Sequence, residues 1–113
     1  MPTERRCAPE GATVGSGSVV PGGGHSSRAA AERALRAEGL EPHAWADVAG
    51  VVYDVHAHRH HKVLVCVSGG IVFHIAAGDL ALGPGDRLEL PAGVEHGATV
   101  GDAGVECVEA YRR

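Results

Sequence analysis

The sequence predicts an all-β sandwich or barrel preceded by one helix, and three observations support this fold class. From residue 43 onward, short apolar segments are separated by Gly, Asp and Pro at nearly regular spacing. In RLEL at residues 87–90, apolar and charged residues alternate, as in a strand with one buried face. Only one stretch, SSRAAAERALRAEGL, has the residue preferences of a helix.

The first segment, residues 1–25, is expected to be a flexible tail. It is rich in Gly, Pro and Ser and has no periodicity. The alternative for part of this segment is an edge strand around Val19 and Val20. Cys7 and His25 lie in the segment, and we expect neither to have a functional role.

The second segment, residues 26–40, is expected to be the helix. Ser26 or Ser27 can cap its N-terminus, and Gly39 can end it. A narrow apolar stripe around Leu35 indicates that the helix lies across a larger element.

The third segment, residues 42–113, is expected to be the β domain. Its predicted strands are HAWADVAG, VVYDVHAH, KVLVCVSG, IVFHIAAG, DLALGPGD, RLELPAG, EHGATVG and GVECVEAYRR. With 113 residues the chain has room for one domain with one modest core. Aromatic residues make up only 4 %, so this core must consist mainly of Val, Leu, Ile and Ala.

The composition argues against several classes of partner. The formal net charge is −4 and basic residues occur only in short pairs, so nucleic acid is not expected as a partner. No apolar stretch approaches the ~20 residues of a membrane helix, and no signal peptide is apparent, so no membrane partner is expected. Three widely spaced cysteines do not make a disulfide framework, which favours the cytoplasm.

The stretch HAHRHHKVLVCVSGG at residues 56–70 holds four histidines within six positions. His56 and His58 lie two apart at the end of a predicted strand, so their side chains point to one face. His96 follows a Pro-Ala-Gly turn that would bring it back to the same end of the barrel. Three neutral imidazoles suit one divalent ion of Zn, Fe, Ni or Mn and leave positions open for water or substrate. The alternative is a barrel that has lost its metal.

These residues resemble the two motifs of the cupin superfamily. The first motif, G-x5-H-x-H-x3/4-E-x6-G, is matched in spacing by Gly50, His56, His58, Lys62 and Gly69. The second motif, G-x5-P-x-G-x2-H-x3-N, is matched up to its last position by Gly85, Pro91, Gly93 and His96. The resemblance covers roughly residues 43–113 and implies a double-stranded β-helix (jelly-roll) barrel with a single metal site inside.

Two positions depart from the motifs: Lys62 replaces the glutamate ligand and Val100 replaces the asparagine. A protonated lysine cannot coordinate a metal. In one interpretation the site is a bare three-histidine triad, as in cupin-type thiol and diketone dioxygenases, and Lys62 binds an anionic group of the substrate. In the other, Lys62 points away and a further histidine completes the site; the candidates are His60, His61 and His74.

The resemblance implies a scaffold and a metal, and it leaves the reaction open. One hypothesis is a metal-dependent oxidoreductase, dioxygenase-like, that acts on a small anionic metabolite. Lys62 is then expected to position the substrate, and Tyr53 is a candidate acid or base. The alternative is a non-catalytic small-molecule-binding or sensing module. Apart from these two residues the sequence indicates no acid or base at the site, which argues against proton-transfer chemistry.

Cys66 and Cys107 are expected to be small buried hydrophobes. Glu106 and Glu109 are expected on the surface, with the alternative that one of them lies near the metal and replaces the missing glutamate.

Trp45 and Phe73 are expected in the core or in a dimer interface. The segment HAWADVA at residues 43–49 could add to the sheet edge of a second copy, so a homodimer is expected.

Overall fold

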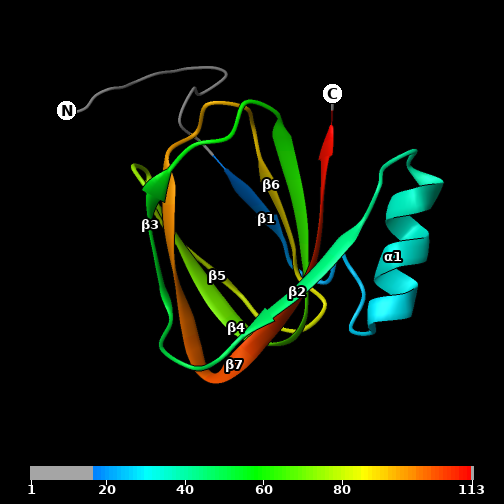
Figure 1. Ribbon diagram of the computed structural model, residues 1–113, viewed down its shortest axis with the longest axis horizontal. Helices are drawn as coiled ribbons and strands as arrows, with labels where there is room; N and C mark the ends of the chain where they lie inside the picture. Colours follow the sequence, from blue (N-terminus) through cyan, green and yellow to red (C-terminus); the bar gives the residue numbers. More distant parts are fainter. Residues whose placement is uncertain (1–16, 113) are drawn as a thin grey trace.

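Two long strands, β4 (His61–Ile75) and β7 (His96–Arg112), form the frame of the fold (Figure 1). The computed structural model describes residues 17–112. β4 and β7 pair antiparallel along nearly their whole lengths, with register shifts in the middle of the pair. The sequence predicted each of them as two shorter strands, because glycines interrupt the apolar pattern. In the structure these glycines bend continuous strands and do not end them.

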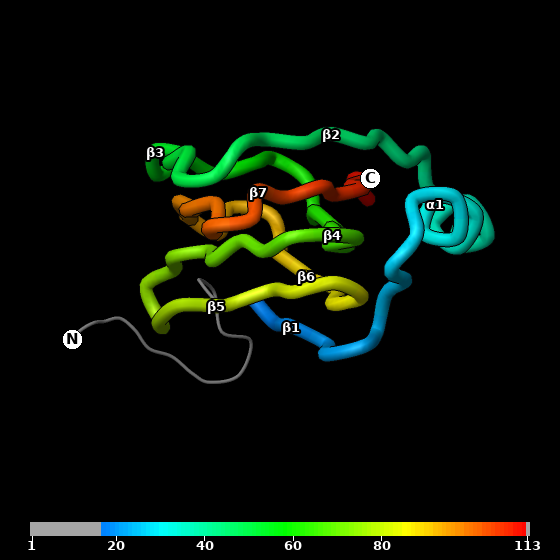
Figure 2. The backbone as a smooth tube through the Cα atoms, turned by 90° about the horizontal axis from the view of Figure 1, so that it is seen from below, coloured from blue at the N-terminus to red at the C-terminus, as the bar shows by residue number. Residues whose placement is uncertain are grey.

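The bends allow each long strand to pair with different strands along its two halves. The first half of β4 pairs with β6 (Arg87–Leu90), which pairs with β1 (Ser18–Val20), and the second half pairs with β5 (Gly78–Leu82). The C-terminal half of β7 pairs with β2 (His43–Asp47), and its N-terminal half pairs with β3 (Val52–His56). In Figure 2 the strands follow one another from β2 through β7, β4 and β6 to β1. Residues 17–112 therefore form the predicted all-β jelly-roll barrel with one helix.

Gly69 and Gly104 meet where the two long strands bend. Both have positive φ, +71° and +75°, a region that side chains other than glycine rarely adopt. A Cβ atom at Gly69 would collide with the carbonyl oxygen of Gly104. Only glycine therefore allows the two bends to touch.

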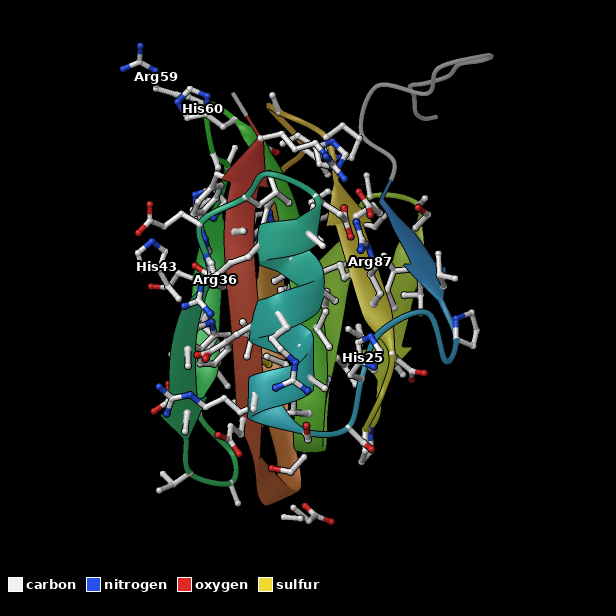
Figure 3. All side chains as sticks on the ribbon, turned by 90° about the vertical axis from the view of Figure 1, so that its right-hand side faces the viewer. His25, Arg36, His43, Arg59, His60 and Arg87 are labelled. Carbon is white, nitrogen blue, oxygen red and sulfur yellow. The ribbon has the colours of Figure 1, made fainter. Side chains whose placement is uncertain are left out.

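The strand β4 is apolar along its first half because both of its faces are buried. Leu64 and Cys66 face the interior of the barrel, which is filled by aliphatic residues from several strands. Val63 and Val65 face outward into a second core. This second core is covered by α1 (Arg28–Ala37), which lies against the outside of the barrel (Figure 3).

The helix α1 has the ends that the sequence predicted. The Ser27 side chain accepts a hydrogen bond from the backbone N–H of Ala30, and Gly39 follows the helix with φ +81°. Leu35 and Ala31 are fully buried against the sheet. The apolar stripe therefore packs on a larger element, as expected.

The N-terminal region contains the edge strand that the sequence allowed at Val19 and Val20. It is β1, and it pairs with β6, so residues 18–20 are not part of a flexible tail. Residues 1–16, with Cys7, lie outside the described part of the chain. Within the described range, no helix has the length and apolar character needed to span a membrane.

Candidate metal centre

The three predicted histidines meet at one end of the barrel. His56 ends β3 and is paired in register with His96, the first residue of β7, while His58 lies in the loop after β3. One ring nitrogen from each histidine lies within 4.8 Å of the other two. The ring centroids are 4.4 to 5.1 Å apart. The three imidazoles are thus close enough to bind one ion together.

Backbone carbonyls orient two of the three rings. His56 Nδ1 lies 2.7 Å from the carbonyl oxygen of Asp54, and His96 Nδ1 lies 3.0 Å from that of Val94. A carbonyl oxygen can only accept, so each Nδ1 carries the proton and each Nε2 keeps its lone pair. This is the arrangement in which a histidine binds a metal through Nε2.

Two imidazole nitrogens have no hydrogen-bond partner among residues 17–112. Nε2 of His58 and Nε2 of His96 are buried, and neither has a hydrogen-bond partner among the described residues. Leaving a buried polar atom without a partner costs about 1–3 kcal/mol. A metal ion between the rings would satisfy both atoms, so the donor set fits such an ion.

Two of the three histidines, His58 and His96, favour the neutral form that binds metals. Burial lowers the pKa of His58 and of His96 below the ordinary value of 6.5, and the positive charge of Lys62 lowers both further. Neutral imidazoles are therefore favoured near pH 7. His56 is exposed while His96 is buried, so the centre is reached from solvent on one side.

The centre opens into a cavity of about 310 Å³ inside the barrel. This volume is at the lower end of the range for small-molecule sites. Besides the three histidines, its lining consists of Trp45, Ala46, Asp47, Tyr53, Lys62, Ile71, Phe73, Ala98, Glu109 and Tyr111.

Lys62 faces this cavity, and its ammonium group is paired there. Lys62 Nζ lies 3.1 Å from Glu109 Oε1, and both side chains are largely buried, 8 % and 17 % exposed. The same oxygen accepts a hydrogen bond of 2.9 Å from Trp45 Nε1, and Tyr111 donates to the other oxygen at 3.3 Å. Three strands thus hold one carboxylate inside the barrel.

Glu109 is therefore not the surface charge that the sequence favoured. Glu109 is two residues after Cys107 on β7, so its side chain lies on the same face of the strand. Cys107 faces the interior, and Glu109 therefore lies inside the cavity. Glu106 has the opposite parity and is not among the residues that line the cavity. The carboxylate missing at position 62 is thus present in the same cavity, supplied by β7.

Tyr53 also lines the cavity, and its hydroxyl donates a hydrogen bond to the carboxylate of Asp47. Burial, followed by the contact with Asp47, raises the pKa of Tyr53 to about 12. Burial and Glu109 raise the pKa of Tyr111 to about 12 as well. Both phenols are therefore neutral hydrogen-bond donors near pH 7.

The other histidines do not join the centre. His60 is exposed in the loop and points away from the barrel (Figure 3). His61 Nε2 contacts Glu89 Oε1 at 2.5 Å. Both ring nitrogens of His74 have partners, Asp79 Oδ1 at 2.8 Å and Thr99 Oγ1 at 2.9 Å. Of the two interpretations of the site, the geometry favours the bare triad with Lys62 facing inward.

Asp47 and Tyr111 are site residues that sequence reasoning missed. Tyr111 continues the alternation of Cys107 and Glu109, so the parity of the last strand was the available signal. Asp47 likewise has the parity of Trp45. Trp45 and Phe73, expected in a core or interface, both line the cavity, and Phe73 is also part of the core.

Comparison with known proteins gave matches among solved structures. No family sequence model matches the chain, and no curated protein sequence matches it. A chain from the crystal structures of the DMSP lyases RdDddP and RnDddQII is 28 % identical with a TM-score of 0.61, over 66 % of this chain and 38 % of that one. An RmlC-like cupin from Shewanella frigidimarina is 28 % identical with a TM-score of 0.57, over 64 % of each chain. KdgF from Halomonas sp. is 25 % identical with a TM-score of 0.55, over 66 % of this chain and 70 % of that one.

The matched region spans about two fifths of the lyase chain. Other solved structures that match are a cupin-2 domain protein from Shewanella frigidimarina and a cupin superfamily protein from Desulfitobacterium hafniense. These neighbours share the barrel in which the two histidine motifs are placed here. The chain belongs to the cupin superfamily.

Proposed function

We propose that this protein is a metal-dependent cupin that holds one divalent ion of Zn, Fe, Ni or Mn through His56, His58 and His96. The observation that carries the proposal is the pair of buried Nε2 atoms, on His58 and His96, that have no partner among the described residues. One ring nitrogen of each of the three histidines lies within 4.8 Å of the other two, close enough to share an ion.

We further propose that the protein is a metalloenzyme acting on a small anionic metabolite, with dioxygenase-like chemistry as the leading hypothesis. A bound ion would supply a Lewis acid and, in the case of iron, redox chemistry. Three imidazole ligands leave further positions open to a substrate. Lys62 lines the same cavity as the histidines, and its ammonium group would bind an anionic group of the substrate in exchange for its ion pair with Glu109.

One observation supports proton transfer as a second candidate reaction. Glu109 brings a carboxylate into the cavity, and a carboxylate can accept a proton from a bound substrate. The sequence argument against such chemistry rested on the apparent lack of this group. One of the solved neighbours is named a DMSP lyase, which is compatible with a lyase reaction here.

We also propose a cytoplasmic homodimer. Strand β2 lies at the end of the sheet order, so its outer edge is available for pairing with a second copy. Cys66 and Cys107 lie opposite each other in register and are both free thiols, which suits a reducing compartment. Light scattering on the purified protein tests the assembly: a mass near twice 11.6 kDa is expected, and a monomer would contradict it.

Elemental analysis of protein purified without a histidine tag tests the metal centre. We expect about one ion per chain in the wild type, and its loss in His58→Ala. His60→Ala is the matched control, because the same side chain is removed from a position outside the cavity. Its metal content should equal that of the wild type.

The element found then selects the reaction assays. Iron would direct attention to oxygen consumption with thiols and diketones, whereas zinc would direct it to lyase and other non-redox reactions. A folded wild type that contains no metal and takes up none on reconstitution would contradict the proposal. The non-catalytic binding module would then be the better interpretation.

A further inference from the structure

All the phenylalanine, tyrosine and tryptophan residues of this protein line one cavity. The sequence contains one Trp, two Tyr and one Phe. Each of them, Trp45, Tyr53, Phe73 and Tyr111, belongs to the lining described above. The rest of the barrel core is aliphatic apart from two cysteines. The aromatic rings are thus concentrated where a ligand would bind.

The rings form two groups within the cavity. Trp45 and Tyr53 meet edge to face, with centroids 5.9 Å apart and an interplanar angle of 81°, so they make two walls of a corner. Tyr111 and Phe73 lie next to the metal centre, 5.3 Å from His58 and 6.0 Å from His96, between ring centroids. Aromatic surface therefore extends from the histidines to the Trp45–Tyr53 corner.

Three of these aromatic side chains donate hydrogen bonds to carboxylates. Tyr53 donates to Asp47, and Trp45 and Tyr111 both donate to Glu109. Apart from the histidines, the charged residues of the lining are the carboxylates of Asp47 and Glu109 and the ammonium group of Lys62, an excess of one negative charge, and Lys62 is paired with Glu109. Aromatic faces together with excess negative charge favour an organic cation. The protein already places one cation this way, since Lys62 Nζ lies 5.8 Å from the centroid of Phe73.

We propose that the cavity binds a small zwitterion, with a quaternary-ammonium-type group in the Trp45–Tyr53 corner beside Asp47 and an anionic group toward the three histidines. The inference deepens the proposed function by naming the ligand class of the same site. It rests on the proposed function only for the anionic end. A cavity of about 310 Å³, at the lower end of the range for small-molecule sites, has room for a zwitterion of this kind.

The cationic end is tested with an isosteric pair in protein freed of metal by a chelator. Choline and 3,3-dimethylbutan-1-ol have the same shape and differ in the positive nitrogen that replaces a carbon. Trp45 is the only tryptophan, so its fluorescence reports on this cavity directly, and calorimetry checks the result. We expect choline to bind at least about tenfold more tightly, as cation–π contacts in a desolvated site allow. Equal affinity for the two compounds, or binding of neither, would overturn the proposal.

Variants that remove one carboxylate test whether Asp47 causes the preference for choline over the neutral alcohol. Asp47→Asn should reduce choline affinity severalfold and leave the affinity for the neutral alcohol unchanged. Asp79→Asn is the matched control, because Asp79 is an exposed carboxylate on β5 outside the cavity. An Asp47→Asn variant that keeps the full preference would contradict the assigned position of the cation.

The anionic end is tested in zinc-loaded protein with glycine betaine and its carbon isostere 3,3-dimethylbutanoate. Both should bind more tightly than in the metal-free protein, and glycine betaine should bind more tightly than its isostere. If neither gains affinity from zinc, the assigned orientation is wrong. A preference for choline in a protein that binds no metal would refute the proposed function alone, whereas metal binding without any charge preference would refute this inference alone.

Discussion

Removing only one partner of the ion pair between Lys62 and Glu109 should lower the free energy of unfolding strongly. Lys62→Met removes the ammonium group and keeps a long apolar side chain. The carboxylate of Glu109 then remains inside the barrel without its counter-charge, at a position that is 17 % exposed. An unpaired buried charge is far more unfavourable than an absent pair.

The size of this loss follows from what remains around the carboxylate. Removing one partner of a buried pair typically costs about 3–5 kcal/mol. Trp45 and Tyr111 still donate hydrogen bonds to Glu109, so the lower end of the range applies. We expect the free energy of unfolding to fall by about 3 kcal/mol in Lys62→Met. Adding Glu109→Gln removes the uncompensated charge and should restore most of that loss.

Urea unfolding of the wild type, both single variants and the double variant measures the coupling between the two side chains. Arg28→Met is the control, because the pair between Arg28 and Glu32 has a similar N–O distance, 3.0 Å, but its arginine is 60 % exposed. That variant should lose no more than about 0.5 kcal/mol. If Lys62→Met unfolds within about 1 kcal/mol of the wild type, or if the double variant is less stable than Lys62→Met, the reasoning fails.

Three further predictions concern the scaffold. Hydrogen bonds from Arg87, together with the charge of Arg112, hold the pKa of Glu38 at about 2, below its ordinary 4.5. The native state thus favours the ionised carboxylate of Glu38. The contribution of this group to protein stability is complete above pH 4.5 and is lost as the pH falls toward 2. Glu38→Gln should cost about 1 kcal/mol at pH 7, because the group is one-third exposed, and urea titrations should show no difference from the wild type near pH 2. Gly69→Ala should unfold at a much lower temperature than Gly50→Ala, because both have positive φ but only Gly69 also lacks room for a Cβ atom; equal melting temperatures would contradict this. Ser27→Ala should lose about 1 kcal/mol of stability in urea titrations through loss of the helix cap, and an unchanged midpoint would show that the cap contributes nothing.

Much of the candidate metal centre could be predicted from sequence, because the motif spacings constrain where the three histidines lie. Two of these features are local and can be recognised without knowing the tertiary structure. They are the Pro91–Gly93 turn before His96 and the single residue between His56 and His58. The helix was predictable for the same reason, since Ser27 and the glycine after the last turn act locally.

Other parts depended on contacts that sequence patterns do not contain. Glu109 was expected on the surface because an isolated carboxylate usually prefers water, and its burial depends on donors from two other strands. The sequence also divided β4 at its central glycines. Whether a glycine ends a strand or bends it depends on the partner strand, here on the close approach of Gly69 to Gly104.

The bent strand β7 reaches the cavity twice along its length. His96 comes from before its bend, and Glu109 comes from after it. The separation between the imidazole cluster and the carboxylate is therefore set by the curvature of a single strand. Because Gly104 has positive φ and lies against Gly69, the bend admits only glycine, and the backbone there fixes how far apart the two ends of a ligand can lie.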